Sequence, residues 1–185
     1  MSDQDRGELV SLIEPLRRSE DSRHRSKLID LALQLAQKSE GFRRSLPDSM
    51  VRSLAGLVRS KNCYYSNLIE GHNTHPIDIE RALKEDYSAD EGKRNLQLEA
   101  KAHIAVQKWI DEAGIEGPAT TVEAIREIHR RFYADVPSEL CWVKHPTTGE
   151  LIEVLPEELR RDDMQVGQHI CVSPGAIPRF LDRYE

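Results

Sequence analysis

The sequence predicts a mostly α-helical protein with one β-hairpin near its C-terminal end. Apolar residues such as Leu28, Leu31 and Leu35 recur every three or four positions as far as residue 133, a spacing typical of amphipathic helices. Between residues 142 and 172 the pattern changes to short alternating segments separated by glycine and proline, which indicates a hairpin. Helical spacing then returns at Ile177.

Glycine and proline indicate where the first helices begin and end. Gly41 is expected to end the helix that contains Leu28, and Pro47 to open a second helix that runs to Gly71. Pro76 suits the first turn of a third helix, because the N–H that proline lacks would be unpaired there. The faces expected to point into the core contain Leu28, Leu31, Leu35, Val51, Leu54, Leu57 and Val58.

The later helices have equally local signals. A polar loop at residues 88–93 leads into a longer helix that Gly114 is expected to end. Thr120 followed by Glu123 predicts a capping box at the start of the next helix. Pro174 and Pro178 indicate the start of the last one.

The composition excludes several classes of protein. With 185 residues and a net charge of −6, the chain can hold one compact domain and a short extension, and it does not wrap nucleic acid through bulk charge. Its first residues lack the layout of a signal peptide, and no apolar run approaches the roughly 18 residues of a membrane span. Cys63, Cys141 and Cys171 are too few and too far apart for a disulfide framework. We expect a cytoplasmic protein without a membrane partner.

One short segment places functional groups at a defined spacing. Residues 66–71 read Ser-Asn-Leu-Ile-Glu-Gly, so Ser66 and Glu70 lie one turn apart on the same face of a helix that Gly71 can end. A carboxylate presented there can accept two hydrogen bonds from one arginine. A simpler interpretation, a solvated glutamate followed by a glycine cap, stays open.

This segment and its surroundings resemble the Fic family of protein adenylyltransferases. Residues 66–71 match the Ser/Thr-x-x-x-Glu-Gly/Asn pattern of the family's inhibitory helix, and residues 77–83 are similar to the helix that follows it. Residues 124–130 resemble the helix that leads into the family's flap. Residues 156–160 resemble the family's Pro-Gly-Glu-Leu-Arg, with Glu157 in place of the glycine.

The resemblance covers about residues 47–185 and implies the N-terminal part of a Fic-like domain. It places the inhibitory helix at about residues 50–71 and the flap hairpin at about residues 142–172. Residues 1–46 match nothing specific, and we expect an N-terminal helical extension there.

The resemblance also implies an activity. Members of the family transfer AMP from ATP, with Mg²⁺, to Tyr, Thr or Ser hydroxyls of protein substrates. Their catalytic loop, His-Pro-Phe-x-Asp/Glu-Gly-Asn-Gly-Arg, does not occur in this sequence, in which His145 and Pro146 are followed by Thr-Thr-Gly. We expect His145 to lie in a turn, the catalytic motif to belong to a longer parent, and this chain by itself to transfer no AMP and to bind no cofactor tightly.

Roles for single residues follow from the same resemblance. Glu70 would pair with the last arginine of the catalytic motif, where the γ-phosphate of ATP belongs, and Ser66 would hold the helix against the active-site loop. The flap would dock the target by adding it as an extra strand. The flap residues expected to do so are Leu151, Ile152, Val154, Val166 and Gly167. A second interpretation of the flap, as a hairpin that covers a helical core, stays open.

Other interpretations of the chain remain. It could be a non-catalytic helical interaction protein, such as an antitoxin-like inhibitor that supplies Glu70 in trans to a separate Fic domain, or a helical bundle without nucleotide chemistry. A homodimer is also open. Glu70, His72 and His75 lack the spacing of a zinc site, so we expect no metal there. His129 lies on an apolar helical face, which favours a hydrogen-bonded structural histidine.

Overall fold

The computed structural model describes residues 5–13, 20–112, 114–145 and 147–184, without the side chains of Leu12 and Ile13. Contacts divide the chain into two compact units. One contains residues 14–58, and the other combines residues 1–13 with residues 59–185. The predicted boundary between residues 46 and 47 stays a prediction, and each unit is described by itself.

The fold is mostly α-helical, as the sequence predicts. Its α-helices are α1 (Arg25–Ser45), α2 (Asp48–Ile69), α3 (Pro76–Leu83), α4 (Glu91–Asp111), α5 (Val122–Ala134) and α6 (Ile177–Tyr184). Short 3₁₀ helices cover Val10–Ile13, Ser138–Leu140 and Pro174–Ala176. The expected starts of α2 and α3 are confirmed, because α2 begins just after Pro47 and Pro76 occupies the first turn of α3.

Two predicted helix boundaries were wrong. Gly41 lies inside α1, which continues to Ser45. The helix stops at Leu46 because the residue before a proline avoids the α conformation, and Leu46 is extended with ψ 136°. At the start of α5, Thr121 rather than Thr120 is the cap, and its side chain accepts a hydrogen bond from the Ala124 N–H at 3.2 Å.

The region after α5 contains two small antiparallel hairpins instead of one. Strand β1 (Trp142–Lys144) pairs with β2 (Leu151–Glu153), and β3 (Gln165–Val166) pairs with β4 (His169–Ile170). In the second hairpin Gly167 follows β3 with φ 59°, a left-handed conformation that glycine adopts without steric cost. The expectation of a single hairpin over residues 142–172 was therefore wrong, because each strand pairs with its neighbour in the sequence.

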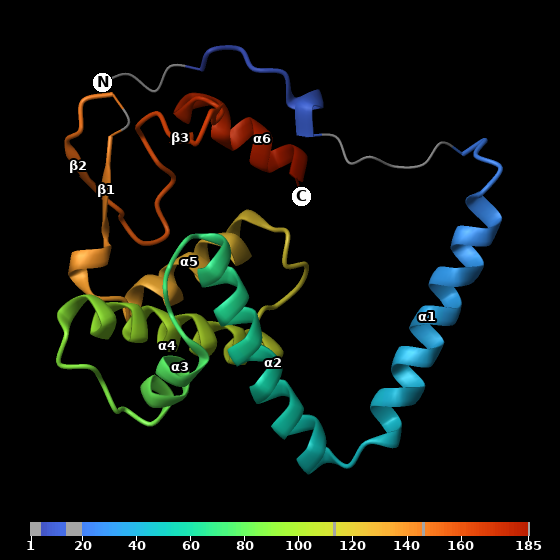
Figure 1. Ribbon diagram of the computed structural model, residues 1–185. Coiled ribbons are helices and arrows are strands. Elements are labelled where there is room, and N and C mark those ends of the chain that lie inside the picture. The colour runs from blue at the N-terminus through green and yellow to red at the C-terminus, as the bar shows by residue number, and fades with distance from the viewer. Residues whose placement is uncertain (1–4, 14–19, 113, 146, 185) are drawn as a thin grey trace. The chain divides into compact units, whose positions relative to one another are not determined.

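The core of the larger unit is small and lies where α3 and α4 meet the C-terminal half of α2. Its buried members are Cys63, Ile79, Ala100 and Ile104. Helices α3 and α5 both pack against α4, and Figure 1 shows these helices side by side. The core forms because apolar side chains at helical spacing leave water together, at roughly 25 cal/mol per Å² of apolar surface.

A buried glutamine joins α4 to the segment around α3. Gln97 is fully buried, and its Oε1 accepts a hydrogen bond from the Ser88 N–H at 2.7 Å. Its Nε2 donates to the carbonyl oxygens of Asp78 at 3.2 Å and Asp86 at 3.3 Å. One side chain thus satisfies three backbone groups that would otherwise lack partners away from water.

The unit formed by residues 14–58 has no buried side chain in its described part. Leu35 is 70% exposed and Leu57 is 55% exposed, although both were expected to face a core. Leu28, Leu31, Leu54 and Val58 are exposed as well. Periodicity shows which residues share a face of a helix, but the cover on that face comes from other parts of the structure.

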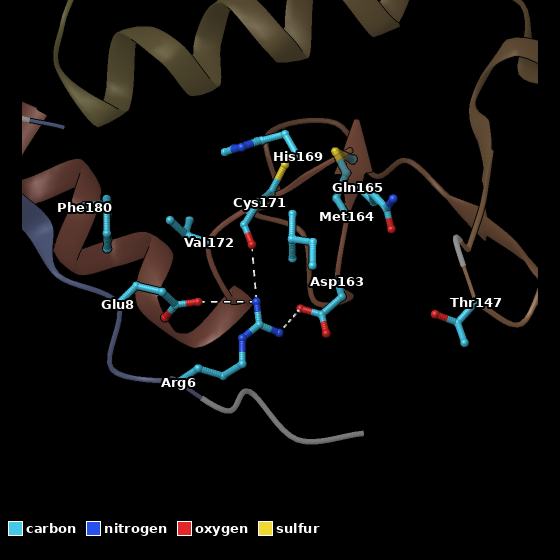
Figure 2. A pocket seen from close by; sticks show the side chains of 11 residues that line it. Arg6, Glu8, Thr147, Asp163, Met164, Gln165, His169, Cys171, Val172 and Phe180 are labelled. Carbon is cyan, nitrogen blue, oxygen red and sulfur yellow. Dashed lines mark hydrogen bonds and ion pairs between the residues drawn. The ribbon is translucent and has the colours of Figure 1, made fainter. Parts of the chain in front are cut away.

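The N-terminal segment is held against the start of the last helical stretch. Figure 2 shows the Arg6 guanidinium between Glu8, Asp163 and the Cys171 carbonyl, at the edge of a cavity of about 670 Å³. The Glu8 carboxylate accepts hydrogen bonds from the Ser173 N–H at 2.7 Å and the Ser173 hydroxyl at 2.8 Å. Arg179 adds a hydrogen bond to the Asp5 carboxylate at 2.8 Å. Residues far apart in the sequence thus form one polar cluster.

This cluster predicts a dependence of stability on acid. Burial alone would raise the pKa of Glu8, but the hydrogen bonds from Ser173 and the charge of Arg6 outweigh it and lower the pKa from 4.5 to about 2. The stabilisation by ionised Glu8 is complete above pH 4.5 and is lost as the pH falls through about 2. Thermal unfolding of Glu8→Gln should therefore occur below that of the wild type at pH 6, with a difference that shrinks toward pH 2. The unfolding temperature of Glu116→Gln, on an exposed loop, should stay close to that of the wild type at every pH. A difference between Glu8→Gln and the wild type that does not change with pH would contradict the prediction.

Candidate functional site

The last turn of α2 ends in a hydrogen-bonded motif that fixes the position of Glu70. The Gly71 N–H bonds to the Leu68 carbonyl at 3.2 Å, and the His72 N–H bonds to the Asn67 carbonyl at 2.8 Å. This pair of bonds is the Schellman motif, and Gly71 has the left-handed φ of 79° that the motif requires. Glu70 is therefore the residue that caps α2, and the expected end of the helix at Gly71 is confirmed.

The predicted inhibitory residues lie on the exposed side of this helix end. Ser66 and Glu70 are both exposed, one turn apart, and the Glu70 N–H donates to the Ser66 carbonyl at 3.1 Å. Neither the Ser66 hydroxyl nor the Glu70 carboxylate has a hydrogen bond or ion pair with another described residue. A carboxylate at a helix C-terminus meets the negative end of the helix dipole, so an external cation would stabilise it. The Glu70 carboxylate is therefore open to a positively charged group.

Three apolar side chains in the last turns of α2 are also exposed. Tyr65 is 56% exposed, Leu68 is 55% exposed and Ile69 is 83% exposed. Within the described residues nothing covers Leu68 or Ile69. Contiguous patches of exposed apolar side chains are typical of a contact surface.

Buried side chains beside this exposed end anchor the turn to the larger unit. Asn67 and Thr74 are each 4% exposed, and Asn67 Nδ2 donates to Thr74 Oγ1 at 3.2 Å. Beside them, His72 Nδ1 lies 3.2 Å from Glu99 Oε1 on α4. Neither contact was predicted from the sequence. Asn67 could have been noticed as a candidate, because it adjoins Ser66 in the sequence. No local pattern connects Glu99 to residue 72.

The predicted flap residues are spread over both hairpins. Leu151 is 62% exposed and Val166 is 64% exposed, whereas Ile152 and Val154 are half-buried. Ile152, Val154 and Val166 line a cavity of about 680 Å³ that α5 also borders, while Leu151 and Gly167 lie outside it. The structure thus brings three of the five residues to one cavity.

His129 connects α5 to the segment after β2. Its Nδ1 accepts a hydrogen bond from the Glu157 N–H at 2.9 Å, and its ring lies 4.7 Å from the Tyr133 ring. Burial lowers the pKa of His129, so the neutral form, with its proton on Nε2, is favoured. The hydrogen bond expected for this histidine is therefore confirmed, whereas its structural role stays a prediction.

Glu157 has a backbone conformation that glycine prefers. Its φ is 59°, and this is the position where the resembling family has glycine. A side chain in the left-handed region costs roughly 1–2 kcal/mol, while glycine adds entropy to the unfolded chain. We expect Glu157→Gly to stabilise the protein by about 0.5–1 kcal/mol, after that entropy is subtracted.

Chemical denaturation of matched variants checks this expectation. Glu158→Gly, at the next residue, removes the same side chain where φ is not positive and should destabilise the protein. The ion pair between Glu157 and Arg130 lies on the surface at 3.8 Å, so its removal should change the stability little. Equal destabilisation by both variants would show that strain at residue 157 is not relieved.

The remaining candidate groups have ordinary structural roles. His145 lies in the connection from β1 to β2, where its Nδ1 accepts from the N–H groups of Thr147 and Thr148, so the predicted turn is confirmed; Pro146 lies outside the described residues. Burial raises the pKa of the Cys63 thiol to about 12, which keeps it protonated at neutral pH. In the described ranges, no group of three His, Cys, Asp or Glu side chains could hold a metal ion. No helix in the described part of the chain is long and apolar enough to cross a membrane.

Comparison with known proteins adds no relative, because no family model, no curated protein and no solved structure matches the chain.

Proposed function

We propose that the chain is the autoinhibitory and target-docking part of a Fic-type protein that transfers AMP from ATP to hydroxyl groups of target proteins. The observation that carries the proposal is the free carboxylate of Glu70, held at the end of α2 and exposed beside Ser66. In this arrangement Glu70 accepts a guanidinium that would otherwise bind the γ-phosphate of ATP. Arginine suits both partners, because its planar fork matches carboxylate and phosphate oxygens equally well.

The surroundings of Glu70 support the same proposal. Tyr65, Leu68 and Ile69, in the same two turns of α2 as Ser66 and Glu70, are exposed, as expected where a catalytic core packs against the inhibitory helix. The two hairpins offer unpaired strand edges, to which an extended target segment can add. The chain by itself transfers no AMP in this proposal, because the histidine base and the phosphate-binding loop belong to the catalytic motif, which it does not contain.

The proposal is tested in a polypeptide in which this chain is followed by a Fic catalytic core that contains the catalytic motif. In this polypeptide Glu70 is replaced by glycine. This polypeptide is called the joined polypeptide below. Transfer of labelled AMP from ATP is measured, and release of the arginine should increase it. Full inhibition of a separate Fic domain by the isolated chain would instead favour an inhibitor that acts in trans.

A further inference from the structure

The position of the Glu70 carboxylate depends on the last turn of α2. Glu70 follows the last helical residue directly, and helix ends open more readily than helix interiors. An open turn would let the carboxylate leave the place where a guanidinium has to meet it. The contacts that keep this turn closed therefore decide how well Glu70 can bind.

Two side-chain contacts connect the turn to the rest of the larger unit. The first is the buried hydrogen bond from Asn67 to Thr74, which links α2 to the residues just before α3. The second is the pair formed by His72 and Glu99, which links the turn to α4. His72 is also the residue whose backbone N–H closes the Schellman motif, so its side chain and its main chain act on the same turn.

The His72–Glu99 pair is partly shielded from water. The Glu99 side chain is only 18% exposed, and the Nδ1 atom of His72 is buried although the ring is 40% exposed. That nitrogen has no hydrogen bond of good geometry among the described residues, which leaves the Glu99 carboxylate at 3.2 Å as its polar neighbour. A contact between polar groups with little solvent around them is screened less by water and salt than a contact on the open surface.

We propose that His72 and Glu99 are positioning residues for inhibition, which hold the end of α2 closed and so keep Glu70 where it can bind a guanidinium. This inference rests on the proposed function. It adds a distant residue on α4 that controls the inhibitory carboxylate without touching the guanidinium that the carboxylate binds.

The contact is tested first in the chain itself, by hydrogen exchange of the Gly71 and His72 amides. Glu99→Gln removes the charge with almost no change in shape, and His72→Phe keeps a ring without nitrogen. Each should speed the exchange of both amides about fivefold, which corresponds to about 1 kcal/mol at 25 °C. The double variant should be no faster than the faster single variant, because both changes break the same contact.

An ion pair between α2 and α4 provides the matched control. Arg59 on α2 lies 2.6 Å from Asp111 on α4, far along the helix from Glu70. Asp111→Asn removes a carboxylate charge from α4 just as Glu99→Gln does, but it should leave the exchange of the Gly71 and His72 amides unchanged. Unchanged exchange in both Glu99→Gln and His72→Phe, or an equal increase in Asp111→Asn, overturns the inference.

AMP transfer by the joined polypeptide separates this inference from the proposed function. Glu99→Gln should raise transfer several-fold, less than Glu70→Gly does, and should add nothing when Glu70 is already glycine. Transfer that rises in Glu70→Gly but not in Glu99→Gln overturns the inference alone. Transfer unchanged in both variants, with faster amide exchange in Glu99→Gln, overturns the proposed function and the inhibitory role of the pair with it.

Discussion

Glycine in place of Glu70 should raise AMP transfer by the joined polypeptide at least about tenfold. A hydrogen bond between charged groups contributes roughly 1.5–3 kcal/mol, and each 1.4 kcal/mol changes an equilibrium by a factor of ten. Loss of the Glu70 carboxylate removes such bonds to the arginine and leaves its fork free for the γ-phosphate. Glu70→Gln should give a smaller rise, because the amide still fills the space but has no charge.

The matched control for this prediction is Glu112, which follows the last residue of α4 as Glu70 follows that of α2. Glu112→Gly makes the same substitution at an equivalent place in another helix and should leave AMP transfer unchanged. Circular dichroism should show that the three variants keep the helical content of the wild type. AMP transfer by a folded Glu70→Gly variant at the wild-type rate would contradict autoinhibition by this residue.

Leucine in place of Gln97 should produce the largest loss of stability, about 3 kcal/mol of unfolding free energy. The substitution leaves the Ser88 N–H and the carbonyls of Asp78 and Asp86 without their partner in a place that water does not reach. Each buried polar group without a partner costs roughly 1–3 kcal/mol, and part of this is recovered when the loop before α4 relaxes. The segment around α3 should loosen first, because Gln97 is the side chain that joins it to α4.

Urea denaturation of Gln97→Leu and Gln107→Leu provides the comparison. Gln107 is on the same helix, and its side-chain contacts to Asn62 and His103 are partly exposed, so water can replace them. Its substitution should change the unfolding free energy by less than about 1 kcal/mol. A similar small change for Gln97→Leu would show that the buried hydrogen bonds are not what joins the two segments.

The helix starts at Asp48 and Pro76 and the helix end at Gly71 could be predicted because each depends on a few neighbouring residues. Proline sets its own φ and restricts the residue before it, and glycine allows the left-handed turn that ends α2. The two wrong helix boundaries were equally local, but each required a choice between competing signals. At Gly41 the helix continued because a glycine inside it costs only about 1 kcal/mol.

The pairing of the hairpins and the cover of the helices could not be predicted in the same way. Segments 151–153 and 165–166 both alternate, and alternation does not say which segment pairs with which. The apolar stripe of Leu28, Leu31 and Leu35 was predicted to be buried, yet no described residue of its own unit covers it. Both outcomes depend on contacts between residues that are distant in the sequence.

In the candidate site, too, some features depend on neighbouring residues and others on contacts between separate helices. Local chemistry places Ser66 and Glu70 one turn apart at a helix end that Gly71 closes, because the hydrogen bonds and steric limits involved reach only a few residues along the chain. The exposure of the carboxylate, the buried Asn67–Thr74 bond and the approach of Glu99 to His72 depend on how α2, α3 and α4 pack. Packing brings together residues from separate helices, so no local pattern of the sequence contains these contacts.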